Sequence, residues 1–298
     1  MKIAFLGLGR MGSAMASRLV QDETLSLVVW NRSADKAKPL TDLGATAAAD
    51  PAEAIAGAEI VMTSLLDDAS IEALFHEGSP ALAAMRLNAI HLGLTTISPD
   101  CGNRLQALHA AHGTRYVSGP VLGRPDAAAK GALVQFLAGD ASALVEVEAA
   151  TKAFAVRTVP LPGLAGAANS QKLCVNFFLA CLLESMSECY TLGDALGVSR
   201  EALAAFFAQS FAHPGLKGYA ERMNARQGDS VDGFAMTAGL KDVRLIREAA
   251  AKVNCPVDVA DLVAGKMEDA VARGMGGQDW SAVQEISRLR AGLPSQAV

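Results

Sequence analysis

The sequence has few aromatic and few charged residues. Aromatic residues make up 5% and charged residues 19% of the 298 residues, whereas 51% are hydrophobic. This composition can fill a large core and excludes a disordered chain, which is rich in charge and poor in apolar residues. The net charge of −5 leaves no basic excess for nucleic acid or anionic lipid. We therefore expect a folded protein with neither nucleic-acid nor membrane partners.

Patterns typical of disulfide, zinc and targeting segments are also lacking. The five cysteines are odd in number and form no CxxC, so neither a disulfide framework nor a zinc site is predicted. Cys174, Cys181 and Cys189 recur along one side of an expected helix, and we interpret them as small core residues. We find no signal peptide at the N-terminus and no apolar run of roughly 18 to 20 residues, the length of a membrane span. We expect a cytoplasmic protein.

Short apolar strands alternate with helical segments in the first 120 residues. Helical patterns cover Met11–Val20 and Ala34–Leu43. This alternation is typical of a parallel sheet covered by helices on both faces, and it predicts a Rossmann-type α/β domain. The expected strands are Ile3–Leu6, Leu25–Trp30, Glu59–Leu65, Asn88–Gly93 and Arg115–Ser118.

The pattern changes to helices alone after the proline-containing segment Val159–Gly163. We place a boundary there, giving a Rossmann-like α/β domain of residues 1–162 and an all-helical domain of residues 163–298. Leu173–Leu183 is apolar on almost every side, which predicts burial all round, between domains or subunits. This surplus of apolar surface favours a homodimer or homotetramer. The expected helices are 165–193, 200–209, 215–226, 241–252 and 257–273.

A GxGxxG motif follows the first strand and opens the first helix. Gly7 permits a tight turn, Gly9 lets backbone approach a pyrophosphate, and Gly12 allows close helix packing. The helix N-terminus adds free N–H groups and partial positive charge. The alternative is a tight turn without a ligand. The motif predicts a dinucleotide site with contacts from Gly7, Leu8, Gly9, Arg10, Met11 and Gly12.

The end of the second expected strand indicates which nicotinamide cofactor binds. An acidic residue there would hold the ribose 2′-hydroxyl of NAD, but this chain has Asn31, Arg32 and Ser33. An arginine guanidinium suits a 2′-phosphate, although a solvated arginine at a strand end is the alternative. We predict NADP(H) in preference to NAD(H), with further cofactor contacts from Leu65 and Leu66.

Residues 7–15, GLGRMGSAM, resemble the signature of the β-hydroxyacid dehydrogenase family, which includes 3-hydroxyisobutyrate dehydrogenase. Four further segments agree in order and spacing, so the resemblance runs nearly end to end. Residues 93–99, GLTTISP, resemble the family's D-x-S-T-I-S-P stretch. The resemblance implies that Thr95 and Thr96 lie beside the nicotinamide and that Thr95 also contacts substrate. Ser98 and Pro99 independently predict a helix N-cap.

Residues 118–124, SGPVLGR, resemble the family's substrate loop, D-A-P-V-S-G-G. The resemblance implies substrate contacts from Val121, Leu122, Gly123 and Arg124. Leu122 replaces a serine and Arg124 replaces a glycine, which points away from the usual 3-hydroxy acids. Two alternatives remain for Arg124, a charge clamp on a substrate acid or an exposed surface residue.

Residues 169–176, NSQKLCVN, resemble the family's catalytic helix. The four-residue spacing puts Lys172 and Asn176 on one helical face. A lysine in so apolar a stretch needs a role or a partner, and desolvation is expected to lower its pKa into a range useful for proton transfer. We predict that Lys172 protonates the alkoxide left by hydride transfer and that Asn176 orients the substrate oxygen. The alternative is a lysine that snorkels at a helix end.

Residues 234–242 resemble the family's F-x6-K-D stretch. The resemblance implies that Lys241 contacts the nicotinamide side of the cofactor, and we expect Asp242 to pair with a neighbouring helix. A charge pair at a helix start is the alternative. His109 and His112 are three apart but have no partner at ligand spacing, so no metal is predicted.

These observations favour an NADPH-dependent oxidoreductase that transfers hydride to or from a small carbonyl or hydroxy acid, such as a semialdehyde or glyoxylate. An imine reductase is the second interpretation, because imine reductases resemble the same superfamily. They usually carry another residue type at the position of Lys172, which favours a carbonyl. The third interpretation is a non-catalytic NADP-binding protein, which would be expected to lose that lysine.

Overall fold

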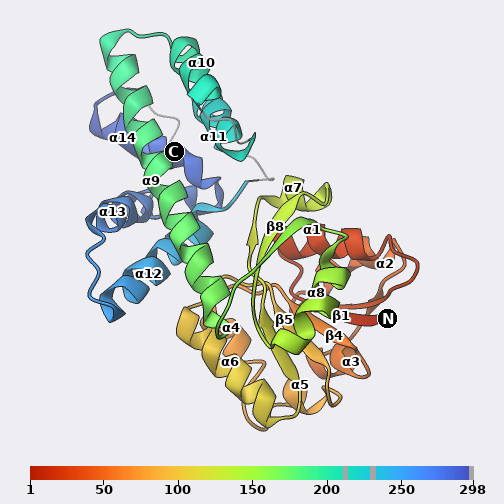
Figure 1. Cartoon of the computed structure of the whole chain (residues 1–298). Helices are drawn as coiled ribbons and strands as arrows, with labels where there is room; N and C mark the ends of the chain where they lie inside the picture. The colour runs from red at the N-terminus through yellow and green to blue at the C-terminus, as the bar shows by residue number, and fades with distance from the viewer. Residues whose placement is uncertain (211–213, 229–232, 295–298) are drawn as a thin grey trace. The chain divides into compact units, whose positions relative to one another are not determined.

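The computed structural model describes residues 1–210, 214–228 and 233–294. The chain forms two compact units, Met1–Lys172 and Leu173–Val298, called here the N-terminal and C-terminal units. Helix α9 (Gly166–Leu196) begins in the first and continues into the second. The mainly parallel sheet of the N-terminal unit and the helices of the C-terminal unit (Figure 1) confirm the predicted fold class.

The sheet has the strand order β3-β2-β1-β4-β5-β6-β8-β7, and β9 pairs with β8. Neighbouring strands from β3 to β6 are parallel, as predicted. The strands are β1 (Lys2–Leu6), β2 (Ser26–Trp30), β3 (Thr46–Ala47), β4 (Ile60–Thr63), β5 (Ile90–Gly93), β6 (Arg115–Ser118), β7 (Val121–Leu122), β8 (Leu133–Gly139) and β9 (Ala155–Pro160).

The far edge of the sheet departs from the prediction. β8 runs antiparallel to both β6 and β7, and the sequence did not predict β3, β7, β8 or β9. An antiparallel partner needs no crossover helix on a sheet face. The chain between β6 and β8 carries only β7 and the short helix α7 (Pro125–Ala129), so the alternating strand–helix pattern ends at β6.

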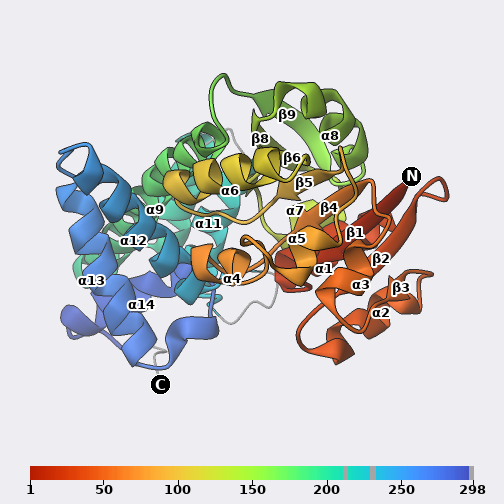
Figure 2. The same cartoon turned by 90° about the horizontal axis from the view of Figure 1, so that it is seen from below.

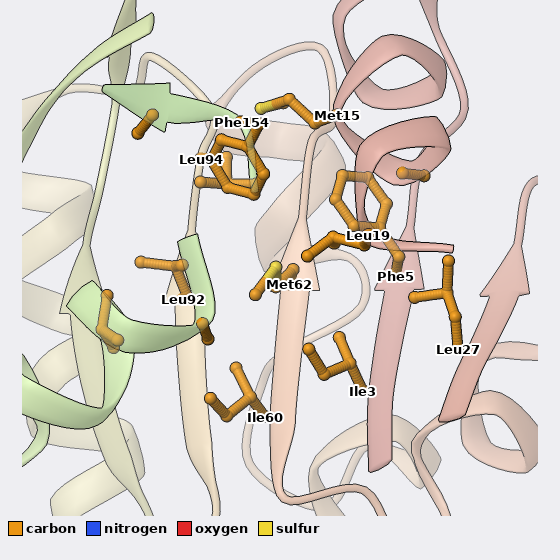
Figure 3. Close-up of a cluster of buried hydrophobic side chains, with 14 of the residues drawn as sticks. Ile3, Phe5, Met15, Leu19, Leu27, Ile60, Met62, Leu92, Leu94 and Phe154 are labelled. Carbon is orange, nitrogen blue, oxygen red and sulfur yellow. The ribbon is translucent and has the colours of Figure 1, made fainter. Parts of the chain in front are cut away.

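Side chains alternate along the buried strands, which gives the sheet two apolar faces. Ile3 and Phe5 pack with Met15 and Leu19 of α1 in one core (Figure 3). Ala4 packs in a second core on the opposite face. Helices therefore cover both faces (Figure 2), namely α1 (Arg10–Leu19), α2 (Lys38–Thr41), α3 (Pro51–Ile55), α4 (Asp68–Glu72), α5 (Pro80–Ala83), α6 (Pro99–Ala111) and α8 (Leu144–Thr151), with 3-10 turns η1 (Ala34–Ala37) and η2 (Ala141–Ala143).

The C-terminal unit has a core of its own. Trp280 is 2% exposed, and its indole N–H donates to the Tyr219 hydroxyl over 2.9 Å. It is therefore the packing anchor of the helices that surround it. After α9 come α10 (Arg200–Ser210), α11 (Pro214–Ala225), α12 (Met236–Lys252), α13 (Asp258–Ala272), η3 (Met275–Gly277), η4 (Trp280–Val283) and α14 (Gln284–Arg290).

Helix α9 buries one side within this chain, so the prediction of burial all round does not hold for one chain alone, and burial of the other side between subunits stays a prediction. Phe178 and Leu192 are 59% and 60% exposed. Cys174 and Cys189 are also exposed and Cys181 is half-buried, so their interpretation as core residues is wrong as well. A turn of 100° per residue carries these positions away from the face that enters the core.

By length and composition alone, α9 could cross a bilayer. Its buried face nevertheless carries Glu184, which pairs with Lys266 of α13. A long apolar helix with a buried, paired charge of this kind is also typical of a protein core.

Candidate active site

The first βα turn has the geometry that a pyrophosphate requires. Gly7 has φ +99°, and a Cβ there would lie 2.3 Å from the Ser64 carbonyl oxygen. A Cβ on Gly12 would lie 2.0 Å from the Gly7 carbonyl oxygen. At Gly9, the N-cap of α1, a Cβ would meet nothing within 4 Å. The turn is therefore closed where it packs and open at the N-terminus of the helix, so these residues fit a dinucleotide.

Asn31 braces this turn. Its Oδ1 accepts the Leu8 N–H over 2.9 Å, and its Nδ2 donates to the Ser33 carbonyl oxygen over 3.0 Å. The Leu8 side chain is buried in the core, whereas Arg10, Arg32 and Ser33 are exposed. The exposed side chains of Arg32 and Ser33 at the end of β2 are available to a ligand. The Asn31 amide, in contrast, already forms hydrogen bonds with the backbone of this turn and of Ser33.

The ends of β4 and β5 are joined by Thr95. Its hydroxyl accepts the Leu65 N–H over 2.8 Å, and the residue is 5% exposed. Thr96 and Leu65 are half-buried, and Leu66 is 65% exposed. The Thr95 hydroxyl thus holds the two loops at the carboxyl edge of the sheet, where ligands of such sheets bind.

The predicted N-cap at Ser98 is confirmed, with a partner that the sequence did not reveal. Its Oγ accepts the Cys101 N–H over 3.1 Å and opens α6. The Ser98 N–H also donates to Asp68 Oδ1 over 2.9 Å. Asp68, on α4, thereby fixes the loop that contains Thr95 and Thr96.

The loop after β6 is anchored to the sheet. Val121 and Leu122 form β7 against β8, and Gly123 has φ +135°. Arg124 is half-buried and lies 3.4 Å from Asp126. Burial raises the pKa of Asp126, but the hydrogen bond and charge of Arg124 outweigh it and hold that pKa below its usual value. Arg124 is therefore partly buried, and it lies close to the Asp126 carboxylate of its own loop.

Lys172 and Asn176 are both buried in α9, at 7% and 3% exposure. Their spacing places them on one face of that helix. Within the C-terminal unit, Asn176 Nδ2 donates to Asp242 Oδ2 over 2.5 Å. Lys241 Nζ lies 2.7 Å from Asp242 Oδ1. Asp242 therefore makes the predicted contact with a neighbouring helix. It also pairs with Lys241, but α12 begins at Met236 and not at residue 241, so this is not the charge pair at a helix start that the alternative described.

The histidines that the structure describes do not gather into a metal site. His109 Nε2 lies 2.8 Å from His91 Nδ1, and Thr63 and Thr114 occupy the outer ring nitrogens. Across residues 1–210, 214–228 and 233–294 there is no group of three or more side chains able to hold a metal ion.

A doubly wound sheet with this glycine turn, followed by a helix with a buried lysine and asparagine, defines an NAD(P)-dependent oxidoreductase. Residues 2–163 match the family described as the NAD binding domain of 6-phosphogluconate dehydrogenase. Residues 166–286 match the one described as NAD-binding of NADP-dependent 3-hydroxyisobutyrate dehydrogenase. The chain belongs to the β-hydroxyacid dehydrogenase family and is a dehydrogenase or reductase of that type, which confirms the resemblance seen in the sequence.

Relatives match over almost their whole length. The chain is 34% identical to the uncharacterised oxidoreductase YfjR of Bacillus subtilis (strain 168), over 95% of this chain and 98% of that one. It is 28% identical to glyoxylate/succinic semialdehyde reductase 1 of Arabidopsis thaliana, over 97% and 99%.

The chain is also similar to solved structures. Mycobacterium tuberculosis 3-hydroxyisobutyrate dehydrogenase with L-serine is 25% identical, with a TM-score of 0.84 over 97% of this chain and 99% of that one. A reductive aminase from Aspergillus terreus with NADPH and ethyl levulinate is 27% identical, with a TM-score of 0.63 over 96% and 99%.

Proposed function

We propose that the protein is an NADPH-dependent reductase of a small aldehyde acid, of the semialdehyde or glyoxylate kind. The observation that carries this proposal is the pair of buried polar residues Lys172 and Asn176 on one face of α9. The name of the Arabidopsis relative, a glyoxylate/succinic semialdehyde reductase, supports this substrate class.

The residues supply what carbonyl reduction needs besides hydride. NADPH, when bound, supplies the hydride that reaches the carbonyl carbon. As that carbon is reduced, its oxygen becomes an alkoxide, and Lys172 gives it a proton. Asn176 orients the oxygen, and Asp242 holds the Asn176 amide from the other side. An amide already held in place loses less conformational freedom when substrate binds.

The preference for NADPH rests on the end of β2. Arg32 and Ser33 are exposed there, and residues 31–33 contain no carboxylate to accept the 2′-hydroxyl of NAD. A guanidinium pairs with a phosphate through two parallel hydrogen bonds. Only NADPH carries a 2′-phosphate, so only NADPH would form such a pair with Arg32.

The acid group of the substrate is assigned to Arg124. Its guanidinium is half-buried, and Asp126 lies at 3.4 Å, at the long end of the hydrogen-bond range. A substrate carboxylate could compete for it with shorter, charge-assisted bonds. Leu122 is half-buried in the same loop and offers no hydroxyl, which favours substrates without a second polar group there.

An imine is the second candidate substrate. The apolar Leu122 in the loop and the similarity to a reductive aminase favour it. Lys172 favours a carbonyl, because an imine nitrogen can arrive already protonated and needs no general acid. Comparing a cyclic imine with aldehyde acids distinguishes the two.

We further propose that the protein is a homo-oligomer, a dimer or a tetramer, joined through the exposed side of α9. That side presents Cys174, Phe178, Cys189, Leu192 and Leu196. The residues recur at intervals of three and four or their sums, which forms an apolar stripe that the exposed Ser185 interrupts. A second copy presents the same stripe, so a two-fold axis can bury both at once.

The experiment that tests the function is NADPH oxidation by the purified protein, beside NADH, with glyoxylate, succinic semialdehyde, methylglyoxal and a cyclic imine. Turnover of an aldehyde acid with NADPH preferred supports the proposal. Turnover of the imine alone supports the second candidate, an imine reductase. The Arg32→Ala variant should lose at least about tenfold in NADPH affinity and little in NADH affinity, and an equal loss for both contradicts the role given to Arg32.

A further inference from the structure

Asn169 joins three segments at the start of α9. The residue is fully buried, at 0% exposure, and lies one turn before Lys172. Its Nδ2 donates to Ser118 Oγ over 2.8 Å, and the Ile97 N–H points to its Oδ1 at 3.4 Å. Ser118 directly precedes the loop of residues 119–124, and Ile97 directly follows Thr95 and Thr96. The Asn169 side chain therefore contacts the residues next to both loops, the Thr95–Thr96 loop and the loop of residues 119–124. It does so from the helical turn that precedes Lys172.

The same turn is fixed to α6 by two further bonds. The Ala165 N–H donates to Gln106 Oε1 and the Gly166 N–H donates to Asn103 Oδ1, each over 2.8 Å. These acceptors satisfy N–H groups that a helix start leaves without partners. A Cβ on Gly166 would lie 2.4 Å from the Pro99 carbonyl oxygen, so the two helices touch through backbone. The helix can neither slide nor rotate here without breaking these contacts.

The Asn169 amide is also held sterically. A Cβ on Gly102 of α6 would lie 2.9 Å from Asn169 Nδ2 and 3.2 Å from Ser118 Oγ. Only a glycine at position 102 leaves room for the bond between them. The amide therefore has one orientation, set by a donor on one side and an acceptor on the other.

We infer that Asn169 is a positioning residue, which sets where Lys172 lies relative to the Thr95–Thr96 loop and the loop of residues 119–124. This inference rests on the proposed function, in which Lys172 gives a proton to the reacting oxygen. Proton transfer depends steeply on the distance between donor and acceptor, and a displacement of about 1 Å can cost about 100-fold in rate. A rigid link between the lysine turn and both loops removes that displacement.

A simple packing role makes a different prediction. If Asn169 only satisfied buried polar groups, its loss would lower stability but leave the proton step of the folded enzyme unchanged. The two roles therefore separate in measurements on folded protein.

The test uses three variants of the full-length protein. Asn169→Ala removes both contacts. Asn169→Asp keeps the shape and both contacts, because the Ser118 hydroxyl can donate to a carboxylate or accept from a carboxylic acid. Ser170→Ala is the matched control: Ser170 is the next residue of the helix, is exposed, and its hydroxyl donates to the Gly166 carbonyl oxygen of its own turn. Ser118→Ala removes the bond to Asn169 and the longer bond, 3.4 Å, to the Tyr116 hydroxyl, and it replaces Asn169→Ala if that variant does not fold.

The expected result for Asn169→Ala is a fall in kcat of about 10- to 100-fold with the KM for NADPH within about twofold. The solvent deuterium isotope effect on kcat should rise, because proton transfer becomes slower than the other steps. Asn169→Asp should recover most of the loss, and Ser170→Ala should match the wild type. A wild-type kcat and isotope effect in folded Asn169→Ala overturn the inference.

A second measurement needs no turnover. The rate at which acetic anhydride acylates Lys172, followed by mass spectrometry of the peptide, reports the accessibility and basicity of that lysine. It should change at least threefold in Asn169→Ala and not in Ser170→Ala, and an unchanged rate overturns the inference. A wild type that reduces no carbonyl, with the acylation change present, overturns the proposed function and leaves the positioning role standing.

Discussion

Asn176 and Asp242 form a buried pair, with the Asn176 amide nitrogen 2.5 Å from the Asp242 carboxylate. The two residues are 66 positions apart, on α9 and α12. Lys241 Nζ also lies 2.7 Å from Asp242 Oδ1. The lysine therefore compensates the charge of the Asp242 carboxylate, although the residue is only 1% exposed. One carboxylate thus fixes an amide and a lysine that the sequence assigned to substrate and cofactor.

Removing this carboxylate should destabilise the C-terminal unit. Asp242→Ala leaves the Asn176 amide buried without its acceptor, and an unsatisfied buried group costs about 1–3 kcal/mol. Urea unfolding should therefore show a loss of about that size. Asp258→Ala, at an exposed position in the first turn of α13, is the control and should stay within about 0.5 kcal/mol. An equal loss of stability in both variants would show that the Asn176–Asp242 pair contributes no more to stability than an exposed aspartate.

Lys172→Ala should abolish most turnover and spare cofactor binding. The variant removes the proton donor, which is worth about 100-fold or more in kcat, while the glycine turn is untouched. Stopped-flow reduction and NADPH fluorescence titration measure the two quantities separately. Lys152→Ala, an exposed lysine at the end of α8, should behave as the wild type. A Lys172→Ala variant that no longer binds NADPH would indicate a structural lysine.

The glycines of the first turn should respond differently to alanine. A Cβ at Gly9 meets open space, and its φ of −71° suits alanine. Gly9→Ala should therefore leave the thermal midpoint of the cofactor-free protein within a few degrees but weaken NADPH binding at least about tenfold. Gly12→Ala places a Cβ 2.0 Å from the Gly7 carbonyl oxygen and should lower the midpoint itself. Normal NADPH affinity in Gly9→Ala would mean that the pyrophosphate does not lie at this turn.

The buried histidines should make stability pH-dependent. Burial lowers the pKa of His91 well below its ordinary value, with a smaller contribution from the charge of His109. Burial likewise lowers the pKa of His109 to about 3, with a smaller contribution from His112. Both histidines stay neutral in the folded state, whereas the unfolded chain takes up protons below about pH 6.5. Stability should therefore be full above pH 7 and fall as the pH drops below about 6.5, by up to about 1.4 kcal/mol per pH unit for each histidine.

Urea unfolding at pH 5.0, 6.0 and 7.5 measures this slope. His109→Gln keeps a hydrogen-bonding group beside His91 but removes one titrating site, so the slope should fall by about half. His76→Gln, at an exposed position, should leave it unchanged. A pH-independent stability in the wild type would contradict the burial of neutral histidines.

The exposed stripe on α9 should control the oligomeric state. Phe178→Glu combined with Leu192→Glu places charges where two apolar surfaces would meet, and the mass measured by light scattering should fall to that of one chain. Val156→Glu, at a 72% exposed valine of β9, tests whether any added charge has this effect and should leave the mass unchanged. A wild type that is already monomeric would refute the proposed interface.

The local patterns of this chain could be interpreted without a structure. The glycine turn, the alternating strands of the parallel half of the sheet, the Ser98 cap and the lysine–asparagine spacing each depend on neighbours a few residues away. Periodicity and backbone constraints act over the same range. The fold class, the dinucleotide turn and the candidate proton donor therefore followed from the sequence.

Tertiary structure decided the features whose partners lie far apart. Asn169 meets Ser118 across 51 positions and Asn176 meets Asp242 across 66, and no local pattern identifies the distant partner of either asparagine. The antiparallel β8 and the exposed cysteines of α9 depended in the same way on which surfaces the folded chain brings together. Hydrophobic pattern sets which elements form, but burial and pairing are properties of the packed whole.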